Sequence, residues 1–217
     1  MFNMEKITFG PALYKTKIST ELKDRLLLSA KNQKIPNNKN LAGRIDNEKL
    51  FDLESHKTFE NEIILIIKDY LKLIIDENTN TDIKFENIGF ILESLWVNFQ
   101  ICNEYNPPHM HGGDISFVIY LDIPDEIKNE TFVGHSTPNG SINFIYGNST
   151  LSHKKENILV DLLQPKSLIS YLPENNEMFI FPSYLMHYVE SFISENVERI
   201  SVSGNITLYN KNSNKLI

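Results

Sequence analysis

The chain has 217 residues and a mass of 25.1 kDa, with 41% hydrophobic and 23% charged residues, which is typical of a globular protein. Its formal net charge of −7 argues against a broad surface for nucleic acid or for an anionic membrane. The single cysteine, Cys102, excludes an intramolecular disulfide and cysteine-rich metal sites.

The N-terminal segment shows neither a basic start with an apolar run nor a membrane span, so we expect a soluble, cytoplasmic protein. Residues 7–19 are predicted to be an extended entry strand. Thr20 then supplies a capping hydroxyl, and acidic residues follow in the first turn of a helix that ends near residues 34–38. Residues 31–49 are polar and carry a proline and a glycine, which favours a long loop.

A second helix is predicted over residues 56–76, because apolar side chains recur there at helical spacing. This stripe is expected to belong to the core, and it consists of Ile63, Ile67, Tyr70, Leu71 and Ile74.

Beyond residue 80, short β-branched and aromatic runs alternate with turn clusters, a pattern that predicts an antiparallel sandwich or barrel. We expect a mainly β, α+β protein with one domain over residues 1–217, in which residues 1–80 are a helical buttress and residues 81–210 the β core. The predicted strands cover residues 88–101, 115–123, 142–147, 168–172, 178–182 and 199–209.

The segment NPPHMHGGD, residues 106–114, gathers groups that can bind a metal. Pro107 and Pro108 are expected to end a strand and to place His109 at its exit. His109 and His111 are two residues apart, so they share a face of an extended backbone. Two glycines then allow a sharp turn, through which Asp114 can fold back. Such a pair of imidazoles is half of a metal site.

A third ligand has to come from elsewhere in the chain, and His187 follows the apolar strand at residues 178–182. Further along, Arg199 and Ser201 alternate to one face of the last strand. A buried arginine is costly unless an anion pairs with it, so Arg199 is a candidate anion receptor. The alternative is a surface arginine paired with Glu195 or Glu198, a contact of little energetic value.

Over residues 90–210, this order of strand, histidine, later histidine and R-x-S resembles the Fe(II)- and 2-oxoglutarate-dependent oxygenases. These enzymes have a double-stranded β-helix, a cupin-like jelly roll, and the closest resemblance is to the prolyl-hydroxylase-like proteins of bacteria and phages. The resemblance implies that His109 and His187 bind iron. It also implies that Arg199, helped by Ser201, binds the far carboxylate of 2-oxoglutarate, and that Asn98 contacts this cosubstrate.

The resemblance fails at one position. The usual middle ligand of the family is a carboxylate two residues after the first histidine, where this sequence has His111. Either His111 binds the metal itself, as in three-histidine cupins, or Asp114 swings in over the glycines. Spacing favours His111, so the predicted ligand set is His109, His111 and His187.

The implied activity is a dioxygenase reaction that uses Fe(II), 2-oxoglutarate and O₂. It hydroxylates a peptidyl, prolyl-type carbon or a carbon of a small molecule, and it releases succinate and CO₂. Two alternatives are a three-histidine cupin-type enzyme that does not use 2-oxoglutarate, and a non-catalytic β-roll binding module. The expected partner is a peptide or small-molecule substrate, and no sequence feature indicates an oligomeric state.

Overall fold

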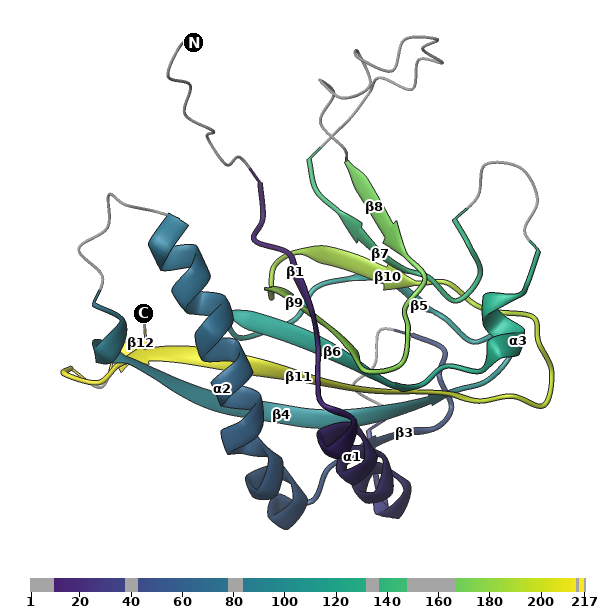
Figure 1. Cartoon of the computed structure of the whole chain (residues 1–217), viewed down its shortest axis with the longest axis horizontal. Helices are drawn as coiled ribbons and strands as arrows, with labels where there is room; N and C mark the ends of the chain where they lie inside the picture. The colour runs from purple at the N-terminus through teal and green to yellow at the C-terminus, as the bar shows by residue number, and fades with distance from the viewer. Residues whose placement is uncertain are drawn as a thin grey trace, which may run out of the picture.

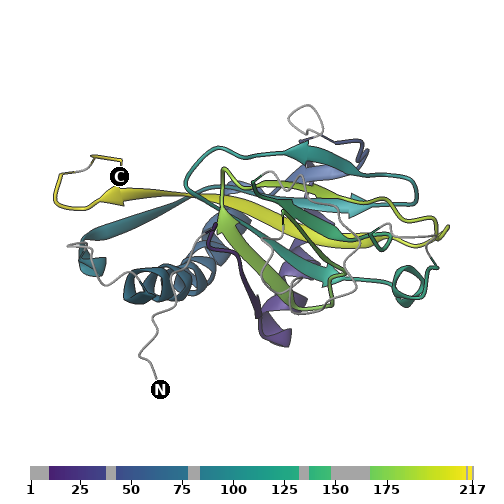
Figure 2. The same cartoon turned by 90° about the horizontal axis from the view of Figure 1, so that it is seen from above.

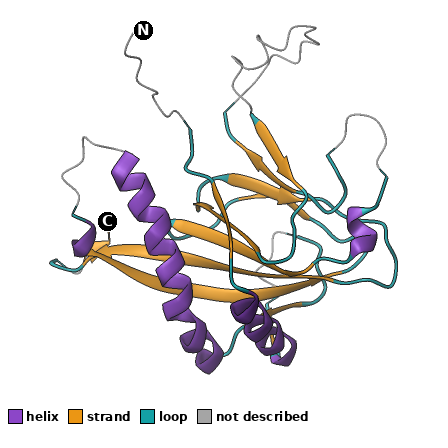
Figure 3. Ribbon diagram, in the orientation of Figure 1, coloured by secondary structure: helices purple, strands orange, loops and turns teal. Residues whose placement is uncertain are grey.

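The computed structural model describes residues 10–37, 43–77, 84–131, 137–147, 167–213 and 215–216 (Figures 1 and 3). The start of the predicted entry strand, residues 7–9, lies outside this part of the chain. The helical elements are α1 (Thr20–Asn32), α2 (Leu53–Glu77), the short 3₁₀ helix η2 (Phe85–Asn87) and α3 (Asp125–Lys128).

Two antiparallel sheets form the body of the molecule. The larger sheet has the order β1-β9-β6-β11-β4-β3-β2, with β12 beside β11, and the smaller has the order β5-β10-β7-β8. The larger sheet consists of β1 (Tyr14–Lys17), β2 (Ile35–Pro36), β3 (Glu48–Leu50), β4 (Ile88–Gln100), β6 (Ile115–Asp122), β9 (Glu177–Pro182), β11 (Arg199–Asn210) and β12 (Lys215–Leu216). The smaller consists of β5 (Asn106–His109), β7 (Ile142–Ile145), β8 (Leu168–Tyr171) and β10 (Met186–Val189).

The two faces of the larger sheet are covered differently (Figure 1). In β4, side chains alternate between the faces: Leu95, Val97 and Phe99 join the core shared with the two long helices, whereas Trp96 and Asn98 point toward the smaller sheet and line a cavity there. A second apolar cluster fills the rest of the space between the sheets, and it includes Val118, Tyr120, Ile142, Phe144, Phe179 and Phe181.

Strands β4 and β11 are longer than the strands of the smaller sheet, and both views show them extending beyond it toward the C-terminal end (Figures 1 and 2). A register shift between Asn205 and Ile206 interrupts their pairing. Helix α2 covers this region, where Ile63, Ile67 and Tyr70 are buried. The predicted helix stripe is thus confirmed, with Leu71 and Ile74 partly buried against the same core.

Two details of the N-terminal prediction are wrong. The hydroxyl of Ser19, not that of Thr20, caps α1 by accepting a hydrogen bond from the backbone N–H of Leu22. The region expected to be one long loop contains β2 and β3, which extend the larger sheet beyond β4. Polar composition concealed these strands because they are only two and three residues long.

Within the described residues, no helix combines the length and the apolar composition that a membrane crossing requires.

We expect the apolar face of α2 to contribute much of the stability of the fold. Ile67 is fully buried, so Ile67→Ala should lower the free energy of unfolding by about 2–4 kcal/mol. Leu65 on the same helix is 60% exposed, and Leu65→Ala should cost less than about 0.5 kcal/mol. Urea unfolding of the two variants measures the difference, and equal losses would show that α2 does not pack as described.

Candidate functional site

The three candidate histidines meet between the sheets. Strand β10 pairs with β5, and this register sets His187 directly opposite His109. The ring centroids of these two imidazoles are 4.3 Å apart, and His111 lies 4.9 Å from His109 and 5.0 Å from His187. One nitrogen of each ring lies within 4.8 Å of the others. The structure thus gathers all three predicted ligands at one point.

The prolines before His109 act differently from our prediction. Strand β4 ends at Gln100, and Pro107 and Pro108 lie inside a separate strand, β5. Because β5 is at the edge of the smaller sheet, residues without a backbone N–H are tolerated there. The prolines therefore help to form the strand that carries His109, rather than ending the one before it.

Backbone carbonyls orient two of the rings. Nδ1 of His109 lies 2.7 Å from the carbonyl oxygen of Pro107, and Nδ1 of His187 lies 2.9 Å from that of Leu185. A carbonyl only accepts, so Nδ1 carries the proton in both rings and Nε2 keeps a free lone pair. Each ring is held in the tautomer that a metal ion needs.

The environment keeps the imidazoles uncharged. Burial lowers the pKa of His109, and it lowers the pKa of His111 to about 4 and that of His187 to about 3, with a smaller contribution from the neighbouring histidine. Neutral imidazole is the form that binds a metal. The cluster is therefore ready for a cation at neutral pH.

Asp114 is held away from the cluster. Its carboxylate accepts a hydrogen bond of 2.7 Å from the backbone N–H of Leu208, and its own N–H donates to Ile206 on the same strand. Gly113 makes the turn with φ of +79°, as predicted, but the turn delivers Asp114 to β11. This geometry does not support the alternative in which Asp114 swings in as a ligand.

Arg199 lies deep in the same cavity and is 3% exposed, so the alternative of a surface ion pair is wrong. Its guanidinium donates to the carbonyl of Gly140 and to Oε1 of Gln100, while its Nε has no partner. In the described part of the chain, no carboxylate forms an ion pair with Arg199. A buried cation that lacks a counter-charge is a strong receptor for an anion.

Register explains how the other predicted residues reach the cavity. Ser201 on β11 lies directly across from Asn98 on β4 and from Tyr120 on β6, and residues directly opposite share a face of the sheet. Asn98, Ser201 and Tyr120 all line the cavity that holds the histidines and Arg199. All six predicted site residues therefore surround one space.

Two further residues belong to this region and were not predicted. Gln100 is buried and orients Arg199, while its amide donates to the backbone of Glu104 and Glu190. Its alternation with Trp96 and Asn98 in the sequence was the signal that could have identified it. Glu48, 1% exposed, lies in the segment that was expected to be a loop, where no pattern marked it.

The donor set fits a divalent transition metal. Imidazole nitrogens suit iron, nickel, copper and zinc, and the Nε2 atoms of His109 and His187 are free to bind. The common non-haem iron site has two histidines and one carboxylate. With His111 in the place of that carboxylate, the metal would keep its full positive charge, and Arg199 adds a second cationic group to the cavity.

Comparisons with known proteins identify the family of this chain and its fold. The model of the family described as "Putative 2OG-Fe(II) oxygenase" matches residues 94–205, more than half of the chain. No curated protein sequence matches.

Solved structures share the fold at low sequence identity. HygX from Streptomyces hygroscopicus, solved with nickel and 2-oxoglutarate, is 12% identical over 90% of this chain and 82% of its own, with a TM-score of 0.53. A viral collagen prolyl hydroxylase from Paramecium Bursaria Chlorella virus-1, in complex with 2-oxoglutarate, is 13% identical over 90% and 95%, with a TM-score of 0.50. An oxidoreductase from Burkholderia pseudomallei is 12% identical, with a TM-score of 0.34. The match covers 54% of this chain and 44% of that protein.

The fold is therefore a double-stranded β-helix with N-terminal helices, as the sequence predicted. The chain belongs to the 2OG-Fe(II) oxygenase family, whose members use Fe(II), 2-oxoglutarate and O₂.

We predict that His111, and not Asp114, is needed for metal binding. His111→Ala should weaken Fe(II) binding by at least about tenfold. Removing even a residue that only hydrogen-bonds to a metal ligand weakens metal binding by that much. Asp114→Ala should keep the metal affinity and lose about 1–3 kcal/mol of stability, because the N–H of Leu208 loses a charged acceptor. Anaerobic Fe(II) titration and urea unfolding separate these effects, and the reverse pattern would make Asp114 the ligand.

Glu48 should make stability depend on pH. Burial raises the pKa of its carboxyl to about 8, so between about pH 4.5 and pH 8 the folded chain keeps a proton that the unfolded chain loses. Stability therefore falls as pH rises through this window, by about 2 kcal/mol between about pH 6 and pH 8. Glu48→Gln should remove this loss in urea unfolding, and an identical pH profile in the variant would contradict the assignment.

Proposed function

We propose that this protein is a hydroxylase dependent on Fe(II) and 2-oxoglutarate. It inserts one oxygen atom of O₂ into a C–H bond of a peptidyl, prolyl-type or small-molecule substrate. The other oxygen atom enters succinate as 2-oxoglutarate loses CO₂. The observation that carries this proposal is the joint presence, in one cavity, of three neutral imidazoles and a buried guanidinium that has no counter-ion among the described residues.

Each residue has a distinct task in this proposal. His109, His111 and His187 hold the iron, and the backbone carbonyls behind His109 and His187 keep Nε2 directed at it. Arg199 binds the far carboxylate of 2-oxoglutarate, since the buried guanidinium gains the anion that it lacks. Ser201 supplies a hydroxyl and Asn98 an amide to the same cosubstrate from the neighbouring strands.

The bound iron and 2-oxoglutarate together supply the oxidising chemistry. The protein orients the cosubstrate, leaves coordination positions open and excludes water from the space between the sheets. Aromatic side chains carry out the last task, because Trp96, Phe117, Tyr120 and Phe181 line the cavity.

Arg199 also separates this proposal from its two alternatives. A three-histidine enzyme that does not use 2-oxoglutarate has no need of a buried cation beside the metal, and neither has a non-catalytic module. Burying a guanidinium without a counter-ion is costly, so its presence supports an anionic cosubstrate.

Anaerobic titration tests this function. Fe(II) with 2-oxoglutarate should give a weak visible charge-transfer band in the wild type. Arg199→Ala should weaken 2-oxoglutarate binding by about tenfold or more, the value of a charged hydrogen bond, while Fe(II) still binds. Gln100→Ala should weaken binding less, because Gln100 only orients Arg199. A wild type that binds no iron, or an Arg199→Ala variant whose band develops at the same 2-oxoglutarate concentrations as in the wild type, would overturn the proposal.

Turnover provides the second check. Purified protein with Fe(II), O₂ and candidate substrates should release succinate in step with a product heavier by one oxygen atom, as mass spectrometry measures. Release of succinate without an oxidised product, for every peptide and metabolite tested, would contradict the proposed hydroxylation.

A further inference from the structure

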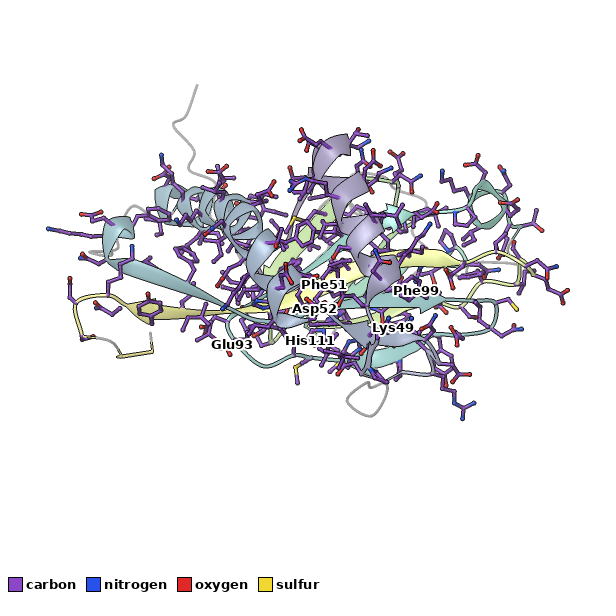
Figure 4. The ribbon with its side chains drawn as sticks, turned by 90° about the horizontal axis from the view of Figure 1, so that it is seen from below. Lys49, Phe51, Asp52, Glu93, Phe99 and His111 are labelled. Carbon is purple, nitrogen blue, oxygen red and sulfur yellow. The ribbon has the colours of Figure 1, made fainter. Side chains whose placement is uncertain are left out.

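A second and larger pocket opens directly beside the histidines. It has a volume of about 520 Å³ and shares Trp96, His109 and His111 with the cavity described above. Its other walls come from β2, β3, the start of α2 and the middle of β4. Figure 4 shows this side of the molecule, with His111, Glu93 and Phe51 around the pocket. A volume of this size holds a small molecule.

A buried carboxyl group lines this pocket. Glu48 lies on β3 directly opposite Asn98 on β4, so both side chains occupy the face of the sheet that carries the site. Asn98 belongs to the inner cavity and Glu48 to the outer pocket. Glu48 therefore stands where the two spaces adjoin, one strand away from the proposed cosubstrate site.

Only one of the two carboxyl oxygens of Glu48 has a hydrogen-bond partner in the described part of the chain. Its Oε1 accepts a hydrogen bond of 2.5 Å from the side-chain amide of Asn37. Its Oε2 is buried and has no hydrogen-bond partner in the described part of the chain. Leaving a buried acceptor unpaired costs about 1–3 kcal/mol, so a ligand that brings a donor to Oε2 recovers that energy.

The charges around the pocket select the kind of donor. Two carboxyl groups, those of Glu48 and Glu93, line it, and no lysine or arginine is among the described residues of its walls. A carboxylate or phosphate on a ligand would meet no lysine or arginine from these described walls. Burial favours the protonated carboxyl of Glu48, but a protonated amine beside it would favour the ionised form. The amine would then form a charge-assisted hydrogen bond with the carboxylate, which is stronger than a neutral one.

We propose that this pocket binds the substrate, that the substrate is a small molecule with a primary amino group, and that this group donates to Oε2 of Glu48. The inference rests on the proposed function, and it names the substrate class and a specificity-determining residue. Anchored at Glu48, the substrate extends past Trp96 toward His109 and His111, which the pocket and the cavity share.

The chain contains its own reporter for this pocket. Trp96 is the only tryptophan, it is buried, and its ring lies 5.5 Å from that of His111. Ligands that fill the pocket should change its fluorescence, without any turnover. We suggest two probes of similar size and opposite charge, n-butylammonium and butyrate, with N-acetyltryptophanamide as the control for quenching in solution.

The probes are compared at about pH 9, where the carboxyl of Glu48 has lost its proton and an alkylamine keeps its own. The wild type should then bind n-butylammonium at least about tenfold more tightly than butyrate, which corresponds to one charge-assisted hydrogen bond. Glu48→Gln keeps the shape and the acceptor for Asn37 but removes the charge, so it should abolish this preference. Glu93→Gln is the matched control, because Glu93 lines the same pocket but is exposed. Because solvent screens an exposed carboxylate, Glu93→Gln should change the preference for n-butylammonium over butyrate by no more than about twofold.

Equal binding of the two probes, no response to n-butylammonium, or equal effects of Glu48→Gln and Glu93→Gln would each overturn the proposal. The wild-type comparison needs no variant, so it stands even where Glu48→Gln fails to fold. The Fe(II) and 2-oxoglutarate titration is independent of these probes. If the wild type shows no charge-transfer band but still prefers n-butylammonium to butyrate, the oxygenase function alone is refuted. If the band is present but the two probes bind equally, the substrate class alone is refuted.

Discussion

The pairing of β5 with β10 is the contact on which the site depends. Its hydrogen bonds place His187 across from His109, and the turn after β5 brings His111 to the same point. Side chains alternate along a strand, so a shift of one residue in the pairing register would turn His187 to the opposite face of the sheet. His187 would then be separated from the other two histidines. Strand β7 pairs with the other edge of β10, with Phe144 opposite His187, and this second partner fixes the register from both sides.

Charge organises the space between the sheets. The imidazoles are neutral, while the guanidinium of Arg199 is buried and its acceptors in the described part of the chain, on Gly140 and Gln100, are uncharged. In the proposed function, a dianionic cosubstrate would therefore meet a cation at each end, the metal at one and Arg199 at the other. The acidic group of the neighbouring pocket, Glu48, lies outside this cationic space. In the proposals above, the arrangement thus separates a region for anions from a region for a hydrogen-bond donor.

The sequence was sufficient for those features that short-range patterns encode. Period-two spacing identified His109 with His111 and Arg199 with Ser201, and helical spacing identified the buried face of α2. Glu48 could not be found in this way, because its position depends on pairing between β3 and β4, fifty residues apart at Glu48 and Asn98. The role of Asp114 also escaped local analysis, since its partner is the distant N–H of Leu208.

The order of strands in the larger sheet has a consequence for synthesis of the chain. Strand β11 lies between β6 and β4, so it alone joins the half-sheet of β2, β3 and β4 to that of β6, β9 and β1. Until residues 199–210 leave the ribosome, both halves present an unpaired edge, which is open to contact with other chains. Arg199 and Ser201 arrive on this same strand. The last long strand made therefore closes the sheet and completes the proposed cosubstrate site in one step.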